Sequence, residues 1–97
     1  MKILIINNQG YTTISTRTQL GQIYEDSKIE FKWANSYSDW EIILKQSDDC
    51  KVFAVEEDVP WYLLKKLVDH NKKQVIMKTK EGWKQVVAVH IETKDIK

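Results

Sequence analysis

Polar and acidic side chains follow two apolar runs of the chain, at positions where they could bind a small ligand. One group follows the run 3–6 and the other follows the run 52–55. In an open parallel sheet, ligands bind beyond the carboxyl ends of the strands. Backbone N–H groups before a helix can also hold an anion there. We therefore predict these ligand-binding residues: Asn7, Asn8, Gln9, Gly10, Glu56, Glu57 and Asp58.

The same residues also fit ordinary structural roles. Neither GxGxxG nor GxxxxGK[ST] occurs, so Gly10 does not belong to a recognisable phosphate loop. An acid is favourable at the start of a helix, and Asp58 is placed to cap one. Glu56, Glu57 and Asp58 offer oxygen ligands for a divalent cation, but the sequence assigns them no partner carboxylate. We predict no metal and no cofactor.

The stretch 3–21 bears on whether the chain is an enzyme. It contains Ile-Ile-Asn-Asn-Gln-Gly-Tyr and Arg-Thr-Gln-Leu-Gly, and it resembles the first strand and helix of glutamine amidotransferase domains. His90 and Glu92 also have the spacing of that family's His-Glu pair. The family's GxCxG elbow does not occur, and Cys50 stands at the entrance of an expected strand without flanking glycines. We assign no catalytic residue and favour a non-enzymatic role.

Four tryptophans are many for a chain of this length. Trp40 and Trp61 fit the apolar stripes of two expected helices, whereas Trp33 and Trp83 fall near strand ends, where they could be exposed. Exposed aromatic side chains supply much of the binding energy at protein interfaces. We therefore predict that Trp33 and Trp83 contact a partner protein or a second copy of the chain.

The densest basic stretch of the chain spans residues 65–84. Its lysines are Lys65, Lys66, Lys72, Lys73, Lys78, Lys80 and Lys84. Lysines beside an aromatic such as Trp83 can follow a single-stranded nucleic acid. Lysines also keep a solvated helix face and a sheet edge from aggregating. The net charge of +1 gives no general attraction to nucleic acid. We favour the structural interpretation.

Length and composition indicate a single domain over residues 1–97. Hydrophobic residues make up 42% and charged residues 30% of the chain, as is usual for a globular protein. The single cysteine excludes an internal disulfide. The apolar run 3–6 is too short for a signal peptide, and no stretch reaches the roughly 20 apolar residues of a membrane span. We expect a cytoplasmic protein that does not enter a membrane.

Hydrophobic periodicity predicts alternating strands and helices. Strands are expected at 3–6, 28–33, 52–55, 75–79 and 83–92, and helices at 16–26, 38–47 and 60–71. The order β-α-β-α-β-α-β-β indicates a three-layer α/β sandwich, with a mostly parallel sheet and a carboxyl-terminal antiparallel hairpin. Residues 11–15 are expected to form a loop. If they form a strand instead, an amino-terminal hairpin over 3–15 would make an α+β fold.

Several residues are expected to cap the amino-terminal ends of these helices or to form their buried faces. Thr16 with Gln19, and Ser38 with Glu41, have the spacing of a capping box. The third helix should bury an apolar stripe made by Trp61, Leu64, Leu67 and Val68.

Two functions fit this sequence. The first is a small non-enzymatic protein-interaction or regulatory domain that acts near Trp33 and Trp83. The alternative is a small-ligand or nucleotide-binding protein, a hydrolase included, that uses the loops after the first and third strands.

Overall fold

A computed structural model describes residues 1–56, 59–70, 73–87 and 92–96. Within these residues the chain forms six strands and three helices. The strands are β1 (Lys2–Asn7), β2 (Glu30–Asn35), β3 (Val52–Val55), β4 (Gln74–Thr79), β5 (Gly82–Val87) and β6 (Glu92–Lys94). The helices are α1 (Ile14–Ile23), α2 (Trp40–Gln46) and α3 (Trp61–Asp69). The predicted α/β order is confirmed.

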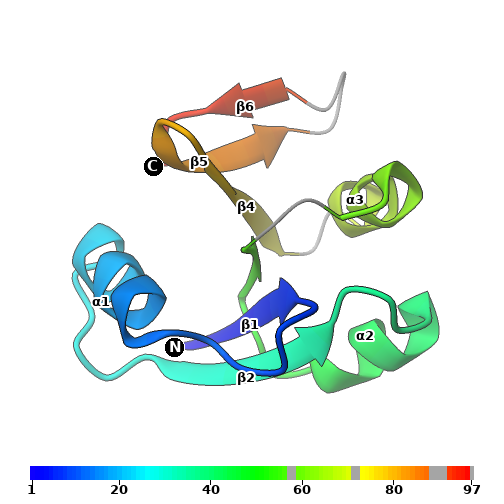
Figure 1. Cartoon of the computed structure of the whole chain (residues 1–97), viewed down its shortest axis with the longest axis horizontal. Coiled ribbons are helices and arrows are strands. Elements are labelled where there is room, and N and C mark those ends of the chain that lie inside the picture. Colours follow the sequence, from blue (N-terminus) through cyan, green and yellow to red (C-terminus); the bar gives the residue numbers. More distant parts are fainter. Residues whose placement is uncertain (57–58, 71–72, 88–91, 97) are drawn as a thin grey trace.

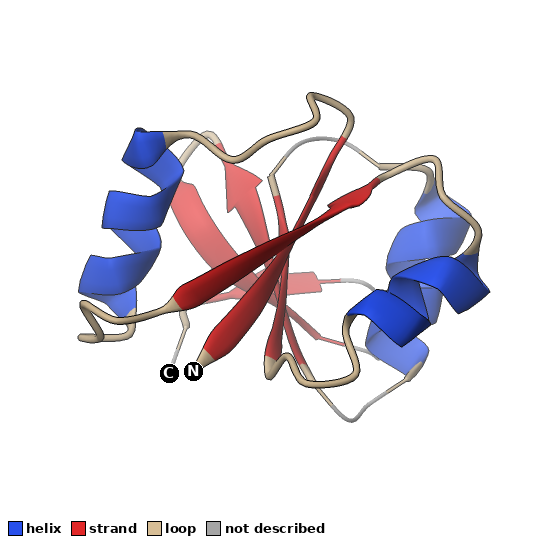
Figure 2. Ribbon diagram, turned by 90° about the horizontal axis from the view of Figure 1, so that it is seen from below, coloured by secondary structure: helices blue, strands red, loops and turns tan. Residues whose placement is uncertain are grey.

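The strands form one mixed sheet between two layers of helix (Figure 1). Their order is β2-β1-β3-β4-β5-β6, with β1 to β4 parallel and β5 and β6 antiparallel to their neighbours. The chain moves from β1 outward to β2 and then returns past β1 to β3. Right-handed crossovers in opposite directions place the helices on opposite faces. Helix α1 therefore covers one face, and α2 and α3 cover the other (Figure 2).

The core lies on both faces of β1 and β3, which explains why residues 3–6 of β1 and all of β3 are apolar. Side chains alternate across a strand, so each strand supplies residues to two clusters. The cluster under α2 and α3 includes Leu4, Ile6, Ile43, Phe53, Val55 and Leu67. The cluster under α1 includes Ile3, Ile5, Leu20, Val52, Ala54 and Ile76. Burial on both faces is typical of parallel strands covered by helices.

Helix α1 starts earlier than the sequence pattern suggests. The hydroxyl of Thr13 accepts the backbone N–H of Thr16 at 3.1 Å, so Thr13 is the N-cap. The expected capping box of Thr16 and Gln19 is wrong, because Thr16 is already inside the helix and Gln19 donates to Ser15. Residues 11–13 form a loop, whereas residues 14 and 15 of the expected loop 11–15 already belong to α1, and the alternative amino-terminal hairpin does not occur.

The first turns of the other two helices also differ from what the sequence predicts. Asp39 precedes α2 rather than Ser38, and its side chain makes no capping hydrogen bond. Pro60 precedes α3, where its missing N–H costs nothing. Trp61 is 63% exposed, so its expected burial is wrong. It occupies the first turn of α3, whereas the buried residues begin at Leu63.

The expected long strand 83–92 consists of two shorter pieces. β5 ends at Val87, and β6 pairs with it antiparallel, with Val86 opposite Thr93. Residues 88–91 between them lie outside the described part of the chain. The turn from β4 to β5 needs a glycine, because Gly82 has a φ of +103°. In the described part of the chain, no helix has the length and apolarity needed to cross a membrane.

Ile5→Ala should destabilise the fold by about 3 kcal/mol, because it leaves a cavity in the cluster under α1. Ile42→Ala is the matched control, since Ile42 is 49% exposed, and it should change stability by about 0.5 kcal/mol or less. Urea denaturation followed by circular dichroism measures both. Similar losses for the two variants would contradict the assignment of the core.

Because of Tyr24, the free energy of unfolding should depend on pH in the alkaline range. Its hydroxyl donates to Gln74 Oε1 at 2.6 Å, and burial raises the pKa of Tyr24 to about 12. The unfolded chain loses this proton near pH 10. The contribution of Tyr24 to stability is therefore complete below about pH 10 and falls as the pH rises towards about 12.

Tyr24→Phe should remove this part of the alkaline loss, measured as the urea midpoint at several pH values across the window. Tyr62→Phe is the control, because Tyr62 is exposed on α3. A wild-type slope that survives in Tyr24→Phe would show that other groups cause it.

Candidate functional site

The predicted ligand-binding residues lie where the sheet changes its winding direction. The chain leaves β1 towards α1 on one face, and it leaves the neighbouring β3 towards α3 on the other. Ligands in doubly wound sheets bind at the carboxyl ends of two such strands. Asn7 ends β1 and Glu56 follows β3. The structure brings them together, since Asn7 Nδ2 donates to Glu56 Oε2 at 3.2 Å.

The side chain of Asn7 is fully buried and fully hydrogen-bonded. Its Nδ2 also donates to the carbonyl oxygen of Tyr11 at 3.0 Å. Its Oδ1 accepts the backbone N–H of Gln9 at 2.9 Å and the indole N–H of Trp33 at 2.6 Å. Two donated and two accepted bonds are the full capacity of an amide. Asn7 therefore holds the strand ends and the loop, and it has no polar group left for a ligand.

The carboxylate of Glu56 is held by side chains from the β1–α1 connection. Oε1 accepts from the hydroxyl of Thr16 at 3.2 Å, and Oε2 accepts from Thr12 at 3.5 Å as well as from Asn7. Thr16 is buried in the first turn of α1. These contacts fasten α1 to the end of β3. The chain's own side chains thus occupy the point at which a ligand would sit.

The remaining predicted ligand residues have different positions. The side chains of Asn8 and Gln9 are exposed. Gly10 has a φ of +87°, which a glycine adopts without strain, so it serves the turn after β1. Glu57 and Asp58 lie outside the described residues, so their predicted roles stay predictions.

The two predicted interface tryptophans are both engaged within the fold. Trp33 is half-buried and donates its N–H to Asn7. Trp83 is only 8% exposed, and its N–H donates to Gln19 Oε1 at 2.9 Å. The expected exposure of Trp83 is wrong, because alternation in β5 turns this side chain towards α1, where it joins the cluster around Leu20.

Most of the exposed large hydrophobic side chains instead follow the carboxyl ends of three neighbouring strands. They are Tyr11 and Ile14 after β1, Tyr37 and Ile42 after β2, and Trp61 and Tyr62 after β3, while Met1 and Ile23 are exposed elsewhere. β1, β2 and β3 are parallel, so these residues share one edge of the sheet. The ligand-binding residues predicted at this edge were chosen for their polar groups. The same rule applied to aromatic residues after each strand would have found them.

Among the described residues, the charged side chains in the connections that follow β1, β2 and β3 are all acidic. Lys80 follows β4, which ends at the same edge beyond β3. The stretches 7–16, 35–44 and 56–64 contain no lysine and no arginine. Asp39, Glu41 and Glu56 supply the negative charge among their described residues. These three connections repel phosphate and attract cations.

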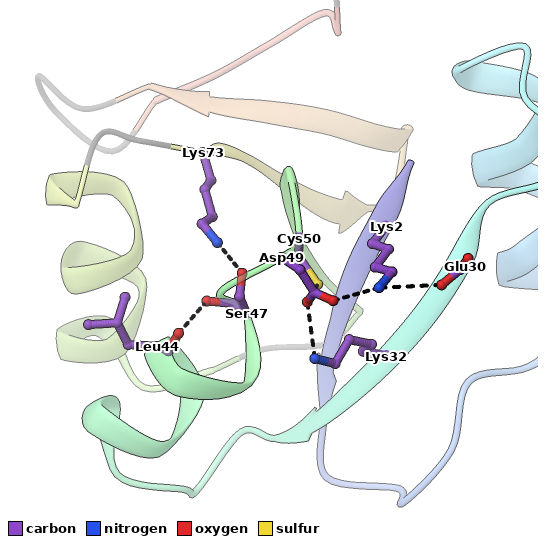
Figure 3. A network of polar contacts seen from close by, with 8 residues as sticks. All are labelled: Lys2, Glu30, Lys32, Leu44, Ser47, Asp49, Cys50 and Lys73. Carbon is purple, nitrogen blue, oxygen red and sulfur yellow. Dashed lines mark hydrogen bonds and ion pairs between the residues drawn. The ribbon is translucent and has the colours of Figure 1, made fainter.

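Basic side chains lie closer to the opposite, amino-terminal ends of the strands (Figure 3). Asp49, just before β3, accepts from Lys2 at 2.6 Å and from Lys32 at 3.1 Å. These two hydrogen bonds hold the pKa of Asp49 below its usual range. The acid is therefore neutralised by its neighbours, and the two ends of the sheet differ in charge.

Cys50 lies next to this network and is buried. Burial raises the pKa of its thiol, with a smaller contribution from Asp49. A thiol nucleophile needs a lowered pKa, so the environment of Cys50 is that of a structural cysteine. His90, the second member of the pair considered from sequence, lies outside the described residues.

The lysine-rich stretch does not form one continuous surface. Lys78 lies opposite Trp83 in the β4–β5 ladder, and Lys84 lies opposite Met77, so the two lysines point to opposite faces. Lys84 pairs with Asp95 at 2.7 Å. A single nucleic acid strand could not contact both faces, and nucleic-acid binding finds no support in this arrangement.

Two grooves flank α1. One, of about 630 Å³, lies between α1 and β2 and includes Arg17, Ile29 and Phe31. The other, of about 540 Å³, lies between α1 and the β4–β5 turn. Among the described residues, no group of three or more His, Cys, Asp or Glu side chains is placed to hold a metal ion. No protein-family model, curated protein or solved structure matches the chain.

Asn7→Ala should destabilise the protein by about 3 kcal/mol, because the partly buried hydrogen-bonding groups of Trp33, Gln9 and Glu56 lose their partner. Asn35→Ala is the matched control. Asn35 lies beside Asn7 in the register of β1 and β2, but it accepts one exposed N–H from Tyr37.

The control should cost about 0.5 kcal/mol. Urea denaturation compares the two variants. Equal losses would mean that the hydrogen bonds of Asn7 are not what holds the strand ends.

Proposed function

We propose that this chain is a non-enzymatic protein-binding domain, and that its carboxyl edge binds a basic segment of a partner protein. The observation that carries the proposal is the set of exposed aromatic side chains in the connections after β1, β2 and β3, where the charged side chains among the described residues are acidic. This proposal keeps the interaction role that the sequence suggested and moves its surface from Trp33 and Trp83 to the loops after β1, β2 and β3.

The exposed aromatics are not needed to complete the core. Tyr37 is 71% exposed in the connection to α2, and Trp61 stands at the start of α3, before its buried residues begin. Neither of the two core clusters includes them. Tyrosine and tryptophan dominate the binding energy of protein interfaces, because they bury much area with few rotatable bonds. Their gathering at one edge supports a binding surface.

The chemistry of the edge supports a basic partner. Lysine and arginine cations are attracted to the faces of tryptophan and tyrosine rings. Carboxylates such as Asp39 and Glu41 add an attraction that also speeds association. A guanidinium or ammonium group beside Trp61 would use both interactions. The occupant that fits is an exposed, lysine- or arginine-containing segment of another protein.

The alternative, a small-ligand or nucleotide-binding protein, has one observation in its favour. Asn7 and Glu56 meet at the point in the sheet where such ligands bind. However, the amide of Asn7 is saturated, and the stretches 7–16 and 56–64 beside it contain no lysine or arginine for a phosphate. The basic protein segment is therefore the better-supported occupant.

Binding can be tested with a fluorescently labelled peptide of alternating arginine and serine, compared with a peptide of alternating glutamate and serine. Anisotropy should show binding of the basic peptide, and Trp61→Ala should weaken it about tenfold or more. Ile23→Ala is the control. Ile23 is a partly exposed apolar residue at the far end of α1, and its loss should leave binding unchanged.

Equal affinity for the two peptides would contradict the proposal, as would a Trp61→Ala variant that binds like the wild type. Amide NMR shifts confined to residues 7–16 on addition of a nucleotide would favour the small-ligand alternative.

A further inference from the structure

Strand β2 forms one edge of the sheet and exposes part of its backbone. Within the described residues its one strand neighbour is β1. The N–H of Glu30 donates to Met1 and that of Ser36 donates to Asn7, so the even-numbered residues direct their backbone groups towards β1. Backbone groups alternate along a strand. Phe31 and Trp33 therefore direct theirs outward, where they form a template for another strand.

The side chains along β2 alternate between apolar and charged residues. Ile29, Phe31 and Trp33 pack at the border of the cluster under α1 and are partly exposed. Phe31 lies beneath the guanidinium of Arg17, with 5.7 Å between the Arg17 Cζ and the ring centre. Glu30 and Lys32 point to the other face. The edge thus carries an apolar row on one face and one charge of each sign on the other.

We propose that β2 pairs antiparallel with β2 of a second copy, about a two-fold axis at Phe31. In this register Phe31 lies opposite its own symmetry mate, and Ile29 lies opposite Trp33. Each Glu30 lies opposite the other copy's Lys32. Phe31, Ile29 and Trp33 are the residues with outward backbone groups, so they form the hydrogen-bonded pairs of the new ladder.

The charges select this register over its neighbours. A two-fold axis at Lys32 places two lysines directly opposite each other, and an axis at Glu30 places two glutamates together. Like charges in cross-strand positions are destabilising. An axis at Trp33 pairs Lys32 with Ala34, so both charges lose their partners. The axis at Phe31 gives two opposite-charge pairs and a continuous apolar row.

Both charged side chains are available for this pairing. The side chain of Glu30 is 70% exposed, and its contact with Lys2 is long, at 3.6 Å (Figure 3). Lys32 forms an ion pair with Asp49, and Asp49 also pairs with Lys2 at 2.6 Å, so it would keep a partner if Lys32 moved away. An exposed ion pair contributes little to stability, so Lys32 can turn towards a partner glutamate at small cost. The resulting dimer would join two six-stranded sheets into one.

Charge reversal tests the dimer and its register together. Sedimentation velocity of the wild type should show a monomer–dimer equilibrium that depends on concentration. Glu30→Lys and Lys32→Glu should each weaken dimerisation by about tenfold or more, because each creates two like-charge pairs. An equimolar mixture of the two variants should regain the wild-type affinity, since positions 30 and 32 then carry opposite charges across the new ladder.

Lys94→Glu is the matched control, because it reverses an exposed lysine on β6 at the other end of the sheet order. It should leave dimerisation unchanged, and circular dichroism checks that every variant is folded. The proposal fails if the wild type stays monomeric at NMR concentrations. It also fails if the mixture of variants does not regain the dimer, or if Lys94→Glu weakens it as much as Glu30→Lys.

Discussion

The buried amide of Asn7 is the interaction on which the carboxyl half of the fold depends. One side chain joins the ends of β1, β2 and β3, because it bonds to Trp33 and Glu56 as well as to the turn that follows it. Glu56 then holds Thr16, and with it the start of α1. An unsatisfied amide in this position would carry a large desolvation cost, so the four bonds and the loop geometry require one another. The loops that display the exposed aromatics are anchored to this network.

A division of charge follows from how the chain alternates strands and helices. Every parallel strand begins at one edge of the sheet and ends at the other, so residues before strands and residues after strands collect on opposite edges. Lys2 and Asp49 belong to the first group, and Glu56 and Asp39 to the second. Among the described residues, the connections after β1, β2 and β3 carry acids, whereas Lys80 follows β4 at the same edge. The same topology gives the protein a polar, cation-attracting end without any clustering in the sequence.

The two proposed surfaces differ in what they use. The carboxyl edge presents side chains from loops and helix starts, whereas the β2 edge presents backbone groups flanked by Phe31 and Trp33. Trp33 lies between the two surfaces, because its N–H donates a hydrogen bond to Asn7 while its ring packs against the cluster under α1. Antiparallel pairing through β2 would leave both carboxyl edges uncovered and facing opposite ways. One dimer could then bind two basic segments.

Periodicity and turn residues by themselves determined the order of elements and the buried strands β1 and β3, and they placed Asn7 and Glu56 at the carboxyl ends of two strands. The contact between Asn7 and Glu56 was decided by the tertiary structure, because it depends on β1 and β3 being neighbours. Only the tertiary structure decided which aromatics are exposed. Trp61 and Trp83 each fit a local pattern, yet the first lies ahead of the buried part of α3 and the second lies under α1. Exposure depends on which element covers a side chain, and covering is set by contacts between residues distant in sequence, which local spacing does not encode.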